Sequence, residues 1–249
     1  MFGVWSLKFE ISAISIAFVD STENTWLLLR SPPADCALNM ALDEALLEAM
    51  PGLGRPVLRF YNWTAPAASF GYFQRYQEVE PLTLLRPLVR RPTAGGLVPH
   101  NGDWTYCICF PSNDEWYSLR ANQSYEKAHT LIKDALCSLG IAAELAPAAK
   151  KTLPGQCFSG YERFDVIYGG TKIAGAAQRR RREGLLIQGS VQSPRASLSS
   201  VEWQQAVVVA ARKQFAIQWN DFEPDESLHI RAEELAGEKY SQAAYNLWR

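Results

Sequence analysis

The segment from Arg163 to Val191 limits the fold most strongly, because it contains three short β-prone stretches in close succession. These stretches are Phe164–Tyr168, Lys172–Gln178 and Leu185–Val191. Gly169 and Gly170 separate the first two, and adjacent glycines between β-prone runs are typical of a tight hairpin. An arginine-rich turn that ends at Gly184 separates the second stretch from the third. The sequence therefore predicts an antiparallel meander.

Stripes of apolar residues at helical spacing predict helices before and after this meander. From Asp35, the predicted N-cap, such a stripe continues until Pro51 and Gly52. A second stripe runs over about 123–139, where Gly140 is expected to cap the helix. Further strands are predicted at 26–29, 57–63, 69–73 and 104–110, and further helices at 201–215 and 226–240. The expected fold class is α+β, with mixed and largely antiparallel sheets flanked by helices.

No repeat, low-complexity tract or linker divides the chain, so we expect one domain at 26–249 after an N-terminal extension at 1–25. The 25 Lys and Arg residues against 26 Asp and Glu residues give a net charge of −1, which supplies no global field for nucleic acid or anionic lipid. The apolar run at 11–19 is too short to span a bilayer. The 5 cysteines are odd in number, which excludes a fully paired disulfide framework and favours a reducing, cytoplasmic location.

The first candidate site is the sequence RRPTAGGLVPH at 90–100. Adjacent glycines let backbone amides approach a ligand, and guanidinium groups bind anionic oxygens. By itself the pattern also fits a surface turn between strands, and it has neither the Lys-Ser/Thr ending of a P-loop nor the GxGxxG spacing of a dinucleotide fold. His100 fits a catalytic base or a positional role at the end of a ligand loop, and the positional role is commoner.

Cys157 is the best candidate nucleophile, because it lies in a loop-like stretch whereas Cys107 and Cys109 share one face of an apolar strand. Lys172 begins the strand after the hairpin, where its ammonium can lower the pKa of the thiol or polarise a carbonyl. From spacing alone, an incidental thiol and an exposed hairpin lysine fit equally well. The run Arg179–Arg182 fits a solvated turn or, as the alternative, a docking patch for an acidic partner. The 3 histidines show no metal-ligand spacing, so we expect no metal.

Four segments, in the same order, resemble the lipoate-protein ligase A family, whose fold is shared with biotin-protein ligases and octanoyltransferases. The segments are NMALDEALL at 39–47, LRFY at 58–61 through SFGYFQ at 69–74, RRPTAGG at 90–96 with Val98 and His100, and GTKIAGAAQRR at 170–180 followed by QGS at 188–190. The resemblance implies one catalytic domain without a C-terminal accessory domain and with Lys172 as a catalytic residue. The substrate-binding residues that it implies are Arg91, Thr93, Gly95, Gly96, His100, Gly175 and Ala176.

The dipeptide Cys157-Phe158 stands where the cysteine-dependent octanoyltransferases of this family carry Cys-Phe. The resemblance then implies that Cys157 takes an octanoyl group from acyl carrier protein and passes it to a lysine of a lipoyl domain, as in glycine cleavage H protein or an E2 subunit. It implies no cofactor, because a thioester drives amide formation. The alternatives are a ligase that needs ATP and Mg²⁺, an amidotransferase between lipoyl domains, and a non-catalytic relative that binds carrier protein.

Two positions depart from the family pattern. Ala94 stands where three consecutive glycines are usual, and Asn101-Gly102-Asp103 replaces the commoner His-Asp start after the loop. Both changes bear on how a ligase would bind an adenylate more than on the chemistry of a cysteine thiol.

Overall fold

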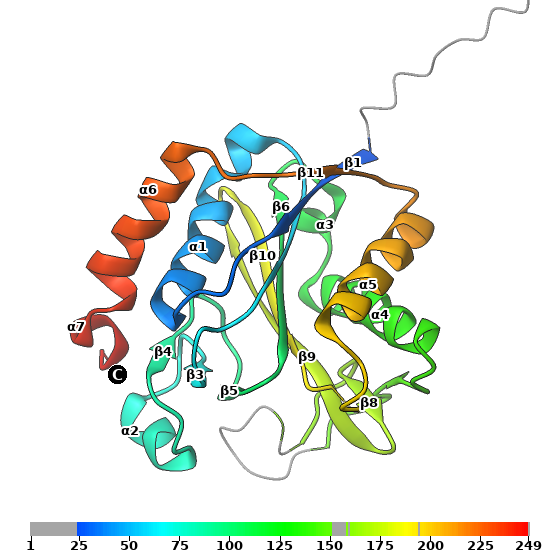
Figure 1. Ribbon diagram of the computed structural model, residues 1–249, viewed down its shortest axis with the longest axis horizontal. Helices are drawn as coiled ribbons and strands as arrows, with labels where there is room; N and C mark the ends of the chain where they lie inside the picture. The colour runs from blue at the N-terminus through cyan, green and yellow to red at the C-terminus, as the bar shows by residue number, and fades with distance from the viewer. Residues whose placement is uncertain (1–23, 151–157, 159, 194, 249) are drawn as a thin grey trace, which may run out of the picture.

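The computed structural model describes residues 24–150, 158, 160–193 and 195–248. An eight-stranded sheet has the order β11-β1-β2-β6-β10-β9-β8-β7, and a three-stranded sheet has the order β4-β3-β5 (Figure 1). The strands of the large sheet are β1 (Thr25–Arg30), β2 (Val57–Tyr61), β6 (Trp104–Pro111), β7 (Glu144–Leu145), β8 (Val166–Tyr168), β9 (Thr171–Arg181), β10 (Gly184–Val191) and β11 (Gln218–Asp221). The strands of the small sheet are β3 (Ala67–Phe70), β4 (Leu88–Arg90) and β5 (Val98–His100).

Helices cover both faces of the large sheet (Figure 1). On one face α1 (Cys36–Leu53) packs against α6 (Glu226–Leu235), and on the other α4 (Ala121–Ser138) packs against α5 (Ser200–Phe215). The short helical segments are α2 (Tyr76–Val79), η2 (Glu80–Leu82), α3 (Glu115–Ser118), η3 (Ala236–Tyr240) and α7 (Ala243–Asn246). The predicted α+β class is confirmed. No helix within the described ranges has the length and apolar character needed to cross a membrane.

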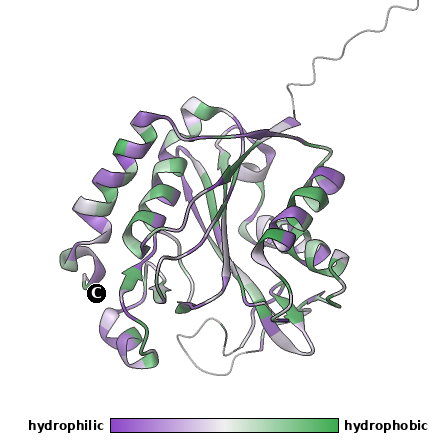
Figure 2. Ribbon diagram, viewed as in Figure 1, coloured by the Kyte–Doolittle hydropathy of each residue, from purple (hydrophilic) through white to green (hydrophobic). Residues whose placement is uncertain are grey.

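Alternation along the central strands builds a separate apolar cluster on each face of the large sheet. In β6, Tyr106 and Ile108 join the cluster of α4 and α5, whereas Cys107 and Cys109 join the cluster of α1. The flanking helices carry both hydrophilic and hydrophobic residues along their length (Figure 2). The prediction that both cysteines lie on one buried face is confirmed.

The predicted meander is present as β8, β9 and β10, which pair antiparallel in sequence order. Its first turn has Gly169 at φ 58° and Gly170 at φ 78°. Two consecutive residues in the left-handed region are what the tightest hairpin turns require, and glycine adopts that region without steric cost.

Helix α1 begins where the sequence predicts and ends slightly later. Asp35 accepts a hydrogen bond from the backbone N–H of Leu38 at 2.8 Å, as an N-cap does. The predicted end at Pro51 is wrong by a few residues, because the chain keeps helical geometry until Gly54 adopts φ 60° and its N–H bonds to the carbonyl of Met50 at 2.9 Å.

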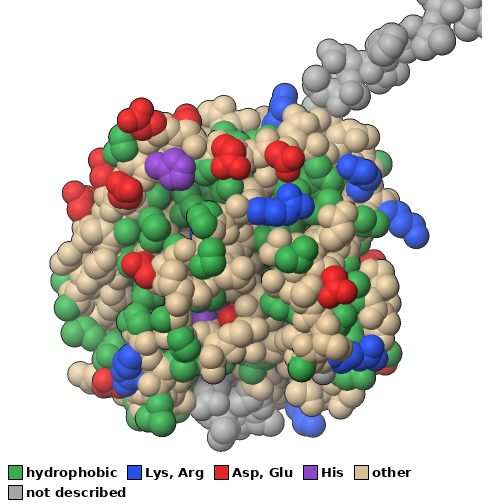
Figure 3. Space-filling model, in the orientation of Figure 1, with side chains coloured by type: hydrophobic (Ala, Val, Ile, Leu, Met, Phe, Trp, Pro, Cys, Tyr) green, Lys and Arg blue, Asp and Glu red, His purple; other side chains and the backbone are tan. Residues whose placement is uncertain are grey.

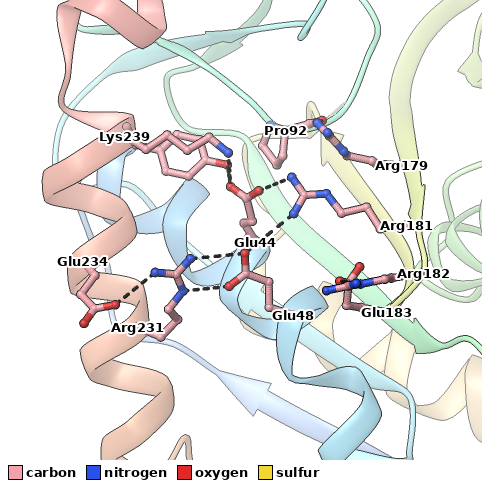
Figure 4. Close-up of polar contacts among 11 residues, drawn as sticks. Glu44, Glu48, Pro92, Arg179, Arg181, Arg182, Glu183, Arg231, Glu234 and Lys239 are labelled. Carbon is pink, nitrogen blue, oxygen red and sulfur yellow. Dashed lines mark hydrogen bonds and ion pairs between the residues drawn. The ribbon is translucent and has the colours of Figure 1, made fainter.

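The interpretation of Arg179–Arg182 as a solvated turn is wrong. Strand β9 continues through Arg181, which pairs with Gly184, so only Arg182 and Glu183 form the turn. The side chain of Arg181 forms an ion pair at 2.5 Å with Glu44 on α1 (Figure 4). The carbonyl of Pro92 accepts from Arg179 at 2.7 Å, and the carbonyl of Leu119 accepts from Arg180 at 2.8 Å. Three of the four arginines therefore hold elements of the fold together.

Glu44 is the centre of this polar network (Figure 4). Its carboxylate also accepts from Lys239 and from the hydroxyl of Tyr240, each at 2.5 Å, which ties η3 to α1. Burial acts to raise the pKa of Glu44, but Lys239, Tyr240 and Arg181 outweigh it and hold the pKa below its usual value. The carboxylate is thus ionised at neutral pH.

Candidate active site

A pocket opens between the loop at 91–97, strand β5 and the facing parts of β9 and β10. The empty space at the pocket is about 420 Å³, including the part open to solvent. Five of the residues predicted to bind substrate line it: Arg91, Gly95, His100, Gly175 and Ala176. The remaining lining residues are Met40, Tyr61, Ser69, Val98, Thr105, Ala177, Gln188, Gly189 and Ser190.

The other two predicted binding residues lie in the same loop but outside the lining. Thr93 is buried, and its hydroxyl donates to Oε1 of Gln188 at 2.7 Å. Because Gln188 does line the pocket, Thr93 acts on the site through that side chain. Gly96 is half-buried beside Gly95.

Arg91 fixes the shape of the loop from inside. Its Nε and Nη2 atoms donate to the carbonyl of Ala94 at 3.1 and 2.6 Å, and Nη1 donates to the carbonyl of Ser69 at 3.3 Å. Gly95 follows at φ 94°, and a Cβ there would lie 2.7 Å from Nη2 of Arg91. Glycine is therefore required at this position by both backbone conformation and space.

Arg90 has a different role from its neighbour and is fully buried. Its guanidinium donates to the carbonyls of Tyr72 and Gln74 at 2.8 and 2.6 Å, and to those of Tyr245 and Asn246 at 3.1 and 3.0 Å. It thereby anchors α7 to β4. Arg91 is buried as well, so neither arginine is a solvated side chain of a surface turn. Charged side chains of both signs are scattered over the face seen in Figure 3.

Lys172 is a buried cation with a buried counter-ion. Its Nζ lies 2.7 Å from Oδ2 of Asp165, and the two side chains are 4% and 0% exposed. Asp165 also accepts hydrogen bonds from the hydroxyl of Tyr125 and from the backbone N–H of Glu162. The carboxylate supplies the counter-charge that a buried ammonium requires. The alternative of an exposed hairpin lysine is wrong, because Lys172 is buried.

The ammonium lies against the wall of the pocket. A Cβ on Gly175 would be 2.6 Å from Nζ of Lys172, so the glycine leaves room for the lysine side chain. Nζ is also 5.3 Å from the ring centroid of Phe158. Burial lowers the pKa of His129, on the neighbouring helix α4, to about 4, so its ring is neutral and adds no charge beside Lys172.

Cys157 lies outside the described residues. Of the other cysteines, Cys36, Cys107 and Cys109 are buried and Cys137 is exposed near the end of α4. Burial raises the pKa of the Cys36 thiol to about 11, and it raises that of Cys107 well above the usual value. None of these four described cysteines lines the pocket.

Three polar residues of the site, Asp165, Asp103 and Ser69, were not among the residues that the sequence predicted for it. Asp165 is an isolated acid in a predicted strand, Asp103 follows a turn, and Ser69 begins a predicted strand. An isolated acid in a predicted strand is the only feature that singles out Asp165. Each takes part in the site only through a partner residue that the fold brings close.

Comparison with known proteins gives a consistent result. The lipoyl protein ligase A/B catalytic domain family matches residues 35–198. Octanoyltransferase LipM of Carboxydothermus hydrogenoformans is 38% identical over 173 residues, which is 67% of this chain and 64% of that protein. The chain thus spans just under two thirds of the length of this relative.

Two solved structures share the fold. A lipoate-protein ligase A bound with ATP aligns with a TM-score of 0.73 and 22% identity, over 90% of this chain and 98% of that one. A bipartite lipoate protein ligase of Thermoplasma acidophilum, studied with its E2 lipoyl domain, aligns with a TM-score of 0.65 and 21% identity, over 90% and 96%. The resemblance read from the four sequence segments is confirmed by the family match, and this chain belongs to the lipoyl protein ligase A/B catalytic domain family.

Proposed function

We propose that this chain is an octanoyltransferase that moves an octanoyl group from acyl carrier protein to a lysine of a lipoyl domain through a thioester on Cys157. The observation that carries the proposal is the buried Lys172 ammonium, which lies beside the pocket and next to the ring of Phe158, the residue after Cys157. The similarity to octanoyltransferase LipM of C. hydrogenoformans supports the same reaction.

The chemistry takes two transfers. The Cys157 thiolate attacks the carbonyl of the donor thioester, the C–S bond of the donor breaks, and the donor leaves as a thiolate. The neutral acceptor amine then attacks the acyl-enzyme, a C–N bond forms and the C–S bond breaks, the nitrogen loses a proton, and Cys157 leaves as a thiolate. The first exchange is nearly balanced and the amide product is more stable, so no nucleotide is required.

Lys172 supplies the positive charge that each transfer needs. A thiol of ordinary pKa near 8.5 is mostly protonated at neutral pH, and an adjacent ammonium stabilises the thiolate both as nucleophile and as leaving group. Asp165, which is not itself a lining residue, keeps the side chain of Lys172 in place. In a ligase, by contrast, the same ammonium would face a carboxylate or an adenylate, and Cys157 would be incidental.

The acceptor is a lipoyl domain, and the pocket holds the acyl chain. The T. acidophilum ligase was studied together with its E2 lipoyl domain as parts of one lipoylation system. Apolar atoms of Val98, Ala176 and Ala177 line part of the pocket, and each buried methylene of an acyl chain contributes about 0.8 kcal/mol.

The decisive experiment incubates the protein with octanoyl-acyl carrier protein in the absence of ATP. Intact mass and peptide mapping should show one octanoyl adduct on Cys157, and the adduct should disappear when a lipoyl domain is added. Cys157→Ala should give no adduct, and Cys137→Ala, which removes an exposed thiol, should react like the wild type. Octanoylation that requires ATP and survives Cys157→Ala would identify a ligase instead.

A further inference from the structure

A chain of hydrogen bonds runs from the pocket into the core through Ser69, His100 and Asp103. Oγ of Ser69 lies 2.8 Å from Nε2 of His100, and Nδ1 of the same ring lies 2.8 Å from Oδ2 of Asp103. Ser69 and His100 line the pocket, and all three side chains are buried. This is the order and spacing in which a histidine serves as a general base.

The fold holds the imidazole ring on several sides. Strands β3 and β5 pair antiparallel, which places Ser69 opposite Val98 and next to His100. The ring of Trp63 stacks on that of His100 with centroids 3.8 Å apart, and the indole N–H donates to Oγ1 of Thr105 at 2.8 Å. The ring therefore has one orientation, as a proton acceptor requires.

The partners of Asp103 decide which nitrogen carries the proton. Its Oδ2 also accepts from the hydroxyls of Ser190 at 2.6 Å and Thr105 at 3.3 Å, as an ionised carboxylate does. Nδ1 of His100 must then be the donor to Asp103, and Nε2 is left with a lone pair that accepts from Ser69. Oδ1 of Asp103 is buried and has no hydrogen-bond partner among the described residues. Its negative charge is thus available to stabilise an imidazolium.

The charges around the pocket explain why a base is needed there. Arg91 lies in the lining, with Nη1 3.5 Å from Oγ of Ser69, and the ammonium of Lys172 lies behind Gly175. Both cations repel an acceptor lysine that arrives as an ammonium, its main form at neutral pH. An ammonium has no lone pair, so the lysine can attack only after a base in the lining has taken a proton from it.

We propose that His100 is the general base of the second transfer and that Ser69 relays the proton to it, with Asp103 as the positioning residue. The hydroxyl of Ser69 gives its proton to Nε2 and takes one from the acceptor ammonium. The neutral amine attacks the thioester carbonyl, the C–N bond forms, the C–S bond breaks, and the cysteine leaves as a thiolate. The second proton on nitrogen is released to solvent as the amide forms, and His100 later releases the first. This assignment rests on the proposed function.

The test separates the two transfers. The enzyme is loaded from octanoyl-acyl carrier protein, freed of donor, and mixed with a lipoyl domain in single-turnover experiments over a range of pH. His100→Gln should load normally but transfer about 10²–10⁴-fold more slowly near neutral pH. Its rate should keep rising with pH, because only the neutral fraction of the acceptor lysine reacts, whereas the wild-type rate levels off. Ser69→Ala should likewise load normally and transfer the octanoyl group more slowly than the wild type.

Asp103→Asn tests positioning, with the tautomer of His100 as a readout besides activity. Nitrogen NMR should show the proton of the wild-type ring on Nδ1 and a mixture of tautomers in the variant. His229→Gln removes an exposed histidine on α6 and should match the wild type throughout. Equal losses in loading and transfer, or transfer by His100→Gln within about threefold of the wild type, would overturn the relay alone. A wild type that never forms the acyl-enzyme would overturn the proposed function and the relay with it.

Discussion

Replacing Lys172 by alanine should abolish octanoyl transfer and also lower the free energy of unfolding. The transfer rate should fall at least about 10²–10³-fold, because the charge that stabilises the thiolate is lost. Asp165 then remains buried without the ammonium of Lys172 beside it. Breaking such a buried ion pair lowers the free energy of unfolding by about 3–5 kcal/mol. Hydrogen bonds from Tyr125 and Glu162 still reach the carboxylate, which places the expected cost near the lower end. Urea unfolding and single-turnover loading measure the two effects.

A double variant separates stability from catalysis. Lys172→Met combined with Asp165→Asn removes both charges while keeping their shapes, so it should recover most of the lost stability and stay inactive. The matched control is Lys133→Met on α4, which breaks an ion pair with Asp134 whose side chains are 29% and 45% exposed. That change should cost less than about 1 kcal/mol. Transfer by the double variant at the wild-type rate would remove Lys172 from the mechanism.

Local patterns in the sequence predicted the elements that depend on nearby residues. The meander followed from Gly169 and Gly170, and the start of α1 followed from Asp35, because turn and cap chemistry acts over a few positions. Strands β4 and β5 were missed because three residues are too few to show alternation. The parallel pairing of β11 with β1 was missed because it joins segments about 190 residues apart, and no short-range pattern records it.

In the candidate site, too, features set by nearby residues were predicted and features set by long-range contacts were not. The loop at 90–100 and Lys172 were found because their residue types are unusual where they stand. The roles of Arg90 and Arg91 were not, because they depend on contacts that the sequence pattern does not record. Arg90, the last residue of β4, donates to the carbonyl of Asn246 in α7, whereas Arg91 donates to the carbonyl of Ala94 in its own loop. Asp165 and Asp103 became part of the site only through tertiary contacts with Lys172 and His100.

Gly71→Ala should disable the site without a change in any polar group. A Cβ on Gly71 would lie 2.9 Å from the carbonyl carbon of Gly95, closer still to its oxygen, and 3.0 Å from the carbonyl carbon of Ala94. These atoms belong to the backbone of the loop, so no side chain can turn aside and the loop itself must shift. The carbonyl of Ala94 holds the guanidinium of Arg91, and that contact would move with it.

A displacement of about 1 Å in a catalytic site costs about 10²-fold in rate, so octanoyl loading of Gly71→Ala should fall by at least that factor. The control is Gly52→Ala in the last turns of α1, where a Cβ meets nothing within 4 Å. Alanine is preferred to glycine in a helix by up to about 1 kcal/mol, so this variant should load normally and unfold at an equal or higher temperature. Normal loading by Gly71→Ala would mean that the loop can move without loss, and then the close approach of Gly71 to Gly95 would not be what shapes the pocket.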